Sequence, residues 1–195
     1  RRLPAEPDLP DAVFVEDTAV VLDDVAVITR PGAESRRPET RTVEQALAGH
    51  RPLVRIEAPA TLDGGDVLVA GHKVYVGLSL RTSRDAVRQL VRLLRPFGYE
   101  VVPVEFQGCL HLKSAATRVA EDLVLLNPAW VDAAIFTGHR AVHVDPHEPH
   151  AANALAVAGS VIHPRHHAGT RARLESADLR VVPVAQEELA KAESG

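Results

Sequence analysis

The stretch VLVAGHKVYVG (67–77) contains two short apolar runs on either side of the pair Gly71-His72. Such a pair tolerates a tight chain reversal, so the stretch predicts a β-hairpin. A helical pattern, SRDAVRQLVRLLRPFG (83–98), comes next, and a β-branched run, EVVPVEF (100–106), follows it. The whole segment therefore predicts one ββαβ unit.

The helix expected within residues 83–98 has the clearest periodicity in the chain. Ser83 is expected to cap its N-terminus, and Pro96 and Gly98 are expected to end it. Its apolar face is expected to consist of residues at positions i, i+3, i+4 and i+7, namely Val87, Leu90, Val91 and Leu94.

The ββαβ pattern recurs along the chain, giving four copies in all. Further hairpins are expected at AVVLDDVAVIT (19–29), RVAEDLVLLN (118–127) and ALAVAGSVIH (154–163), and further closing strands at LVRIEA (53–58), RAVHVD (140–145) and RVVPVA (180–185). The opening RRLPAEP resembles a closing strand, and the chain ends on such a strand and its exit loop. A repeat cut at both ends favours a closed ring with one unit split between the termini and largely absent here. An open ββαβ stack and an ordinary α+β sandwich remain the alternatives.

Composition excludes several classes of protein. With 46% hydrophobic residues over 195 positions, the chain has enough apolar surface to fold, which argues against disorder. Its 12 Gly, 14 Pro and single Cys exclude collagen-like and disulfide-scaffold proteins. The net charge is -4 without a long run of one sign, so we expect no nucleic-acid partner. The longest apolar stretches are strand-sized, so we expect no membrane partner.

Cys109 is the single cysteine and cannot form an intramolecular disulfide. This favours a reducing compartment, and we expect a cytoplasmic location. The sequence has no Met and begins with Arg1, so we expect that it does not begin where translation began. A targeting segment removed before Arg1 remains open.

Acidic residues gather in the loops that lead from each closing strand into the next hairpin. If these loops converge, one cavity would contain Asp11, Glu16, Asp17, Asp63, Asp66 and His111. Paired carboxylates can accept bidentate hydrogen bonds from a guanidinium, so such a cavity suits a compact cation with several N–H donors. Each residue also has a structural alternative, and for Asp66, after Gly64-Gly65, bonding within a turn is the favoured one.

Metal binding is the competing interpretation of the histidines. Two groups lie close in sequence: His139, His143, His147 and His150, then His163, His166 and His167. Prolines interrupt the helix that a four-residue spacing would require. We therefore expect loop histidines that meet solvent, and no metal.

Five strings, FVEDTAVV, ITRPGAESRR, TLDGGDV, VGLSLRTS and LHLKS, occur in this order across essentially the whole chain. Together they resemble the dimethylarginine dimethylaminohydrolase family of guanidino-group-modifying enzymes. The resemblance implies an α/β fold, a fivefold pseudo-symmetric α/β propeller of ββαβ units, with one unit largely missing from this chain. It also implies a single catalytic domain over residues 1–195, truncated at both termini.

The resemblance further implies hydrolysis of N-omega-methylated arginines, dimethylarginine and monomethylarginine, to citrulline and a methylamine through a covalent cysteine intermediate. His111 would be the general acid/base, a role suited to a side chain of ordinary pKa about 6.5, and Asp63 would orient it. The residues implied for substrate binding are Asp11, Glu16 and Asp17 at the guanidinium, Arg36 and Arg81 at the α-carboxylate, and Ala192 through its carbonyl.

The nucleophilic cysteine of the family follows the final exit loop, so we expect it a few residues beyond Gly195. Cys109 is expected to be a buried, inert thiol. We expect no cofactor, a small-molecule methylated arginine as partner, and a homodimer. Two other functions remain open. One is an arginine deiminase or another citrulline-forming hydrolase, and the other is a non-catalytic binder of guanidino ligands.

Overall fold

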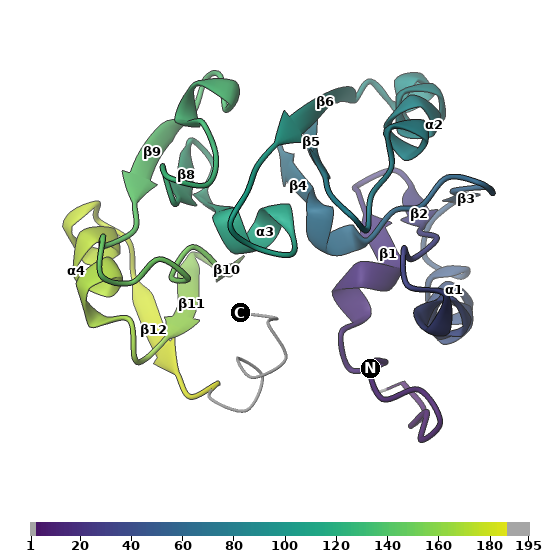
Figure 1. The fold of residues 1–195 in the computed structure, drawn as a ribbon, viewed down its shortest axis with the longest axis horizontal. Helices are drawn as coiled ribbons and strands as arrows, with labels where there is room; N and C mark the ends of the chain where they lie inside the picture. The colour runs from purple at the N-terminus through teal and green to yellow at the C-terminus, as the bar shows by residue number, and fades with distance from the viewer. Residues whose placement is uncertain (1–2, 187–195) are drawn as a thin grey trace. The chain divides into compact units, whose positions relative to one another are not determined.

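The computed structural model describes residues 3–186 of the chain (Figure 1). The chain divides into two compact units. The first unit comprises Arg1–Val67 and His72–Pro103, and the second comprises Leu68–Gly71 and Val104–Gly195. That residues 1–195 form one catalytic domain stays a prediction.

Four three-stranded sheets make up the strand framework, and all four predicted hairpins are confirmed. The strands are β1 (Ala19–Val21), β2 (Ala26–Ile28) and β3 (Leu53–Arg55); β4 (Val67–Ala70), β5 (Lys73–Leu78) and β6 (Glu100–Glu105); β7 (Ala116–Ala120), β8 (Leu123–Leu126) and β9 (Arg140–His143); β10 (Leu155–Val157), β11 (Ser160–Pro164) and β12 (Val181–Val184). In the first, third and fourth sheets the middle strand pairs antiparallel with its hairpin partner and parallel with the closing strand. Three of the four sheets thus share one pairing pattern, and all four share one strand order.

Two of the hairpin turns contain residues with positive φ. Gly71, between β4 and β5, has φ +59°, and Ala158-Gly159, between β10 and β11, has φ +48° and +71°. Positive φ at both central residues matches the right-handed twist of the flanking strands. Glycine reaches this region without the steric cost that a Cβ imposes.

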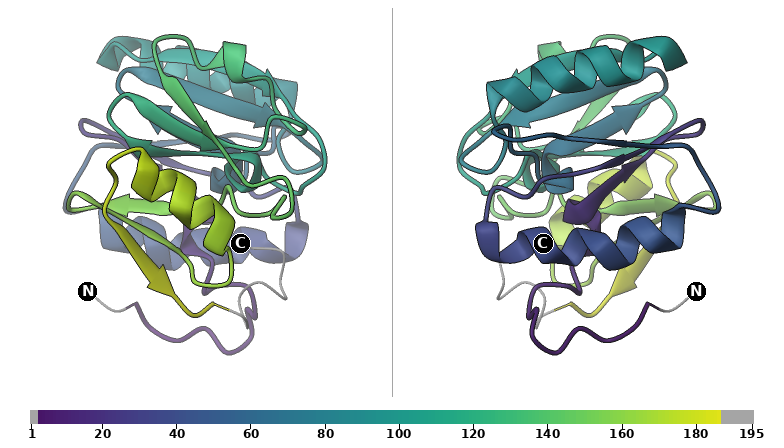
Figure 2. Two further views of the ribbon diagram at one scale, coloured as in Figure 1. Left: turned by 90° about the vertical axis from the view of Figure 1, so that its left-hand side faces the viewer. Right: turned by 90° about the vertical axis from the view of Figure 1, so that its right-hand side faces the viewer.

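Helices connect the middle and closing strands in three of the four repeats. They are α1 (Thr40–Leu47), α2 (Arg84–Leu94) and α4 (Ala168–Ser176), with 3-10 turns η2 (Glu34–Glu39) before α1 and η4 (Arg95–Phe97) after α2. In Figure 2, α4 lies across the strands of its own sheet. The third repeat differs from the prediction, because only the 3-10 turn η5 (Ala133–Ile135) lies between β8 and β9.

Helix α2 begins and ends as its sequence predicts. The Ser83 hydroxyl accepts a hydrogen bond from the Ala86 amide at 3.3 Å, and Gly98 ends the segment at φ +77°. Leu90 and Leu94 are buried, but Val91 is 45% exposed, so the prediction that Val91 belongs to the apolar face is wrong. Ala86 takes part in the buried face instead, which rotates the buried stripe towards positions four residues apart.

A second prediction is also wrong. Residues 3–14 contain no strand, although RRLPAEP resembles a closing strand in sequence. Pro4 and Pro7 supply no backbone N–H, which leaves this segment with fewer donors for a ladder.

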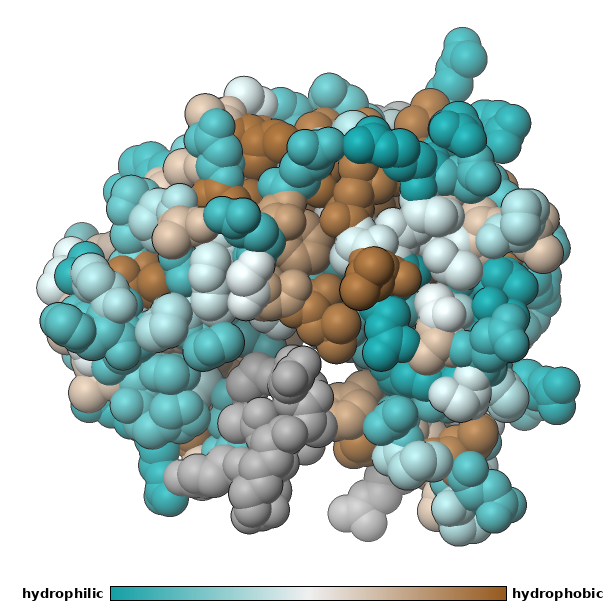
Figure 3. Space-filling view, viewed as in Figure 1, coloured by the Kyte–Doolittle hydropathy of each residue, from teal (hydrophilic) through white to brown (hydrophobic). Residues whose placement is uncertain are grey.

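The core of each unit consists mainly of strand and helix side chains. Val27, Val74 and Tyr75 are fully buried in the first unit. In the second unit Leu123, Leu125 and Val161 pack with Leu174 of α4. On the face shown in Figure 3, hydrophilic side chains predominate with hydrophobic ones between them. Among the described residues, no helix is long and apolar enough to cross a membrane.

Candidate active site

Several of the site residues lie in or next to short helical turns. Each of these turns directly precedes the first strand of a different repeat. These turns are η1 (Val15–Thr18) before β1, η3 (Gly64–Asp66) before β4, and α3 (Leu112–Ala115) before β7. Glu16 and Asp17 belong to η1, Asp63 is the N-cap residue of η3, and His111 is the N-cap residue of α3. The structure therefore confirms that these residues occupy equivalent positions in the repeat.

In the first unit, η1 and η3 approach each other closely at Gly64. A Cβ at this position would lie 2.0 Å from the carbonyl oxygen of Glu16. Only glycine fits against a backbone at that distance. The two glycines of TLDGGDV thus bring the Asp17 and Asp63 turns together.

Asp17 is buried, and both of its carboxylate oxygens accept hydrogen bonds. Oδ1 accepts a hydrogen bond from the Gly65 amide at 2.8 Å, and Oδ2 accepts one from Arg36 Nη1 at 2.6 Å. Two partners fix the plane of the carboxylate.

Arg36 lies between Asp17 and a second buried carboxylate, Glu39. Its Nε and Nη2 donate to Glu39 at 3.1 and 2.9 Å, and Nη2 also lies 3.3 Å from the carbonyls of Asp11 and Phe14. Burial lowers the pKa of Arg36, but the hydrogen bonds and charges of Glu39 and Asp17 outweigh it and raise the pKa overall. The guanidinium is therefore permanently charged and engaged within the protein.

This arrangement bears on the predicted role of Arg36. The family resemblance implies that it binds the α-carboxylate of a substrate, whereas the structure places its donors on Asp17, Glu39 and two backbone carbonyls. Its role towards a substrate stays a prediction. Glu39 was missed by the sequence reasoning, although the spacing of three residues in RRPE is one at which Arg and Glu meet on a helical turn.

Asp63 is 1% exposed and is also held by the backbone. Its Oδ1 accepts a hydrogen bond from the Gly32 amide at 2.8 Å, while its own amide donates to Thr82 Oγ1 at 3.2 Å. A Cβ on Gly32 would lie 2.6 Å from the Cα of Arg81, so glycine is needed here too. Asp63 is thus placed rigidly, as an orienting carboxylate requires.

Asp66 has a structural partner, in line with the favoured interpretation of its sequence position. Its Oδ2 accepts a hydrogen bond from Ser79 Oγ at 2.6 Å. Ser79 Oγ in turn accepts from the amides of Arg81 and Thr82 at 2.9 and 3.1 Å. Asp66 therefore fixes the loop that carries Arg81. The Arg81 guanidinium forms no ion pair with the described residues, which leaves it available to bind a carboxylate.

Asp11 and Glu16, the other two acidic candidates, are both exposed. Asp11 contributes its backbone carbonyl to Arg36, not its side chain, among the hydrogen bonds described above. Glu16 lies next to the close approach at Gly64. Ala192 falls outside the described residues.

His111 and Cys109 lie in the second unit, on the loop before α3. His111 is partly exposed, and its carbonyl oxygen accepts from the Ser114 amide at 3.0 Å and from Cys109 Sγ at 3.2 Å. The expectation that Cys109 is buried is wrong, because this cysteine is only half-buried. Gly108, with φ +81°, turns the chain just before it and leaves the thiol partly at the surface.

The expectation of solvent-exposed loop histidines holds for His147, His150 and His166 but is wrong for His163. His163 lies in β11, is fully buried, and its Nε2 is 3.0 Å from the Ala151 carbonyl. Burial lowers its pKa. The ring of His167, the N-cap residue of α4, lies 4.1 Å from that of His166. Burial, then the charge of His166, lowers the pKa of His167 to about 4.

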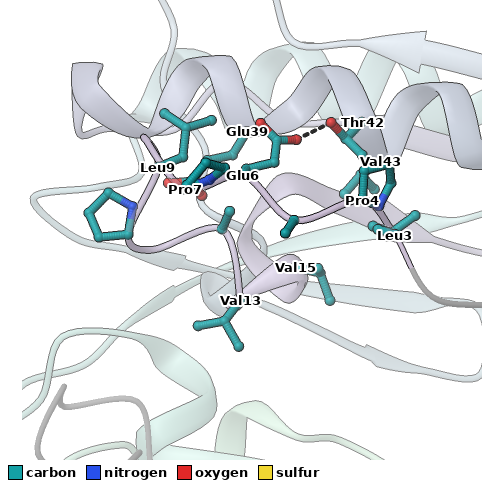
Figure 4. A pocket seen from close by; sticks show the side chains of 13 residues that line it. Leu3, Pro4, Glu6, Pro7, Leu9, Val13, Val15, Glu39, Thr42 and Val43 are labelled. Atoms are coloured by element: carbon teal, nitrogen blue, oxygen red, sulfur yellow. Dashed lines mark hydrogen bonds between the residues drawn. The ribbon is translucent and has the colours of Figure 1, made fainter.

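A cavity of about 640 Å³ lies between residues 3–15 and the start of α1 (Figure 4). Its walls are mainly apolar, including Leu9, Val13 and Val15, and Glu6 on its edge is hydrogen-bonded to Thr42. The carboxylates of Glu6 and Glu39 also line it, but they already accept hydrogen bonds from Thr42 and Arg36, so we do not assign substrate binding to this cavity.

Comparisons with known proteins identify the family of the chain. A family model described as arginine deiminase matches residues 5–194. The chain is 34% identical over 195 residues to the N(G),N(G)-dimethylarginine dimethylaminohydrolase of Pseudomonas aeruginosa, which covers 99% of this chain and 77% of that protein. It is 50% identical over 119 residues to the protein of the same name from Streptomyces coelicolor, covering 60% of this chain and 46% of that protein.

A solved structure gives the same result. It is described as the Pseudomonas aeruginosa enzyme, a cysteine-to-serine mutant complexed with citrulline. The TM-score is 0.92 at 33% identity, covering 97% of this chain and 75% of that one. This likeness confirms the predicted α/β propeller class. The chain therefore belongs to the arginine deiminase family, and within it to the dimethylarginine dimethylaminohydrolases.

Proposed function

We propose that this protein hydrolyses N-omega-methylated arginines to citrulline and a methylamine. The observation that carries the proposal is the 34% identity to a dimethylarginine dimethylaminohydrolase over 99% of the chain. The acidic site of the first unit supports it, because Asp17 presents a fixed carboxylate of the kind that pairs with a guanidinium.

The residues act in the following roles. Asp17, with Asp11 and Glu16, binds the guanidinium, and Arg81 binds the α-carboxylate, whereas the donors of Arg36 are engaged with Asp17 and Glu39. Asp63 orients His111, which serves as general acid and then general base. Ala192 contributes a backbone carbonyl. The chemistry of these groups needs no cofactor.

A cysteine thiolate attacks the guanidinium carbon, and a new C–S bond forms. His111 gives a proton to the departing methylamine as the C–N bond breaks. Water, deprotonated by His111, then attacks the same carbon, and the thiolate leaves as citrulline forms. A cysteine-to-serine mutant of a relative that is complexed with citrulline fits this scheme. We propose that Cys109 is not the nucleophile.

The test is turnover of dimethylarginine by the full-length protein, measured as citrulline formed. We expect His111→Ala to lower kcat by at least about a hundredfold, since general acid–base catalysis contributes that much. Cys109→Ser serves as the matched control and should leave kcat within twofold. Loss of activity in Cys109→Ser with an intact fold would contradict the assignment of the nucleophile.

Arginine deiminase is the second candidate, because the matching family model bears that description. The same charges would then act on unmethylated arginine and release ammonia. Comparing kcat/KM for arginine and dimethylarginine separates the two functions. We propose that dimethylarginine is preferred. A higher kcat/KM for arginine would overturn this preference.

The single cysteine also supports a reducing location such as the cytoplasm. A homodimer stays a proposal, and light scattering of the purified protein would test it.

A further inference from the structure

The strongest feature that the proposed mechanism leaves unused is Glu39. Its side chain is 2% exposed and lies at the end of η2, between Arg36 and the start of α1. Burying an ionised carboxylate this deeply costs free energy unless a positively charged group pairs with it. Its partner is Arg36, which is itself the partner of Asp17.

The geometry makes Glu39 the outer member of a buried chain of charges. Arg36 Nε and Nη2 donate to the Glu39 carboxylate, while Nη1 donates to Asp17. The planar guanidinium is thus clamped on one edge by Glu39, so its remaining edge is aimed at Asp17. Burial raises the pKa of Glu39, and the hydrogen bonds and charge of Arg36 oppose that rise.

The charge of the group leads to the same conclusion. Asp17 with Arg36 alone would be neutral, and a neutral pair attracts a cationic substrate weakly. Glu39 adds a second negative charge, which gives the three side chains a net charge of about −1 when both carboxylates are ionised.

We propose that Glu39 is a positioning residue for guanidinium binding, which holds Arg36 against Asp17 and restores a net negative charge beside the substrate cation. This inference rests on the proposed function and deepens it. Glu39 acts through Arg36 and Asp17 and does not itself contact the substrate.

The chain provides a matched control on the same 3-10 turn. Glu34 pairs with Arg37 at 2.8 Å, also three residues apart, but the Glu34 side chain is 84% exposed. An exposed ion pair of this kind contributes little to the stability of the fold. Glu34→Gln therefore removes the same chemical group from a place where our inference assigns it no role.

The experiment uses full-length wild type, Glu39→Gln, Glu39→Asp and Glu34→Gln, with dimethylarginine as substrate. Glu39→Gln keeps the shape but removes the charge, and we expect KM to rise about tenfold with kcat within threefold. That pattern reports lost binding common to the ground and transition states. Glu39→Asp keeps the charge at a shorter reach, so its KM should lie between the two. Glu34→Gln should leave KM unchanged.

A purely structural role would give a different result. Glu39→Gln would then lower the melting temperature and the fraction of active protein, and so the apparent kcat, with KM within twofold of wild type. That outcome overturns the inference. If wild type turns over neither dimethylarginine nor arginine, the proposed function fails on its own. Calorimetry with L-arginine then decides on Glu39, since a Kd that Glu39→Gln does not change, or no binding by wild type, also overturns the inference.

Discussion

Two glycines of the first unit are determined by what faces them, not by turn geometry. Gly64 faces the carbonyl of Glu16, and Gly32 faces the backbone of Arg81. Neither has a positive φ, so a larger residue would be excluded by the neighbouring chain alone. The site carboxylates Asp17 and Asp63 receive hydrogen bonds from Gly65 and Gly32, next to these contacts. The close backbone contacts at Gly64 and Gly32 therefore also determine where the Asp17 and Asp63 carboxylates lie.

Gly64→Ala is expected to lower the free energy of unfolding by about 1–3 kcal/mol, since the new methyl group must displace the Glu16 backbone. Gly49→Ala is the control, because a Cβ there would meet no atom within 4 Å. Urea denaturation followed by circular dichroism measures both. Equal stability of the two variants would show that η1 and η3 do not approach as closely as described.

At the scale of elements, α2 illustrates which part of a helix its sequence determines. The cap at Ser83 and the end at Gly98 follow from local chemistry, and both were predicted correctly. The face that the helix buries was not predicted correctly, since Val91 is exposed while Ala86 is buried. The apolar residues of this helix can be grouped into more than one possible buried face. Packing against the sheet determines which of these faces is buried.

Leu90→Ala is expected to lower the free energy of unfolding by about 2–5 kcal/mol, because it removes a fully buried side chain. Val91→Ala, one residue on, should change it by less than about 0.5 kcal/mol, because that side chain is 45% exposed. Thermal or urea denaturation of the two variants provides the comparison. A larger loss for Val91→Ala would mean that the helix presents the face predicted from its sequence.

At the scale of the whole molecule, buried His163 and partly buried His167 of the second unit link its stability to pH. The pKa of His167 falls to about 4 in the folded protein because of burial, with His166, His163 and His150 adding repulsion and Glu148 opposing it. Burial lowers the pKa of His163 as well. The unfolded chain therefore binds more protons than the folded chain below pH about 6.5.

Stability is accordingly expected to be full above pH about 6.5 and to fall as the pH drops from there towards 4. The melting temperature at pH 5 should lie below that at pH 7. His167→Gln should reduce this difference, whereas His50→Gln, at an exposed position, should leave it unchanged. A melting temperature that rises on acidification would contradict the assignment.

The candidate site was predicted in its residue types and repeat positions, but not in its pairings. Asp17 and Arg36 are 19 residues apart and belong to different elements, so no local rule connects them. Glu39 lies within the same 3-10 turn as Arg36, yet its burial depends on the elements packed around that turn. His163 shows the same limit, because the predicted hairpin includes it but its burial depends on the chain packed around that strand.

The sequence by itself determined the four hairpins, the caps of α2 and the placement of acidic residues before the first strands. These depend on backbone preferences and on periodicity, which act over a few residues. The tertiary structure alone decided that Arg36 is clamped between Asp17 and Glu39, that Val91 faces solvent, and that the third repeat connects through η5 instead of a helix. The first two depend on which distant atoms exclude water from a side chain, and burial of that kind is a property of the packed chain.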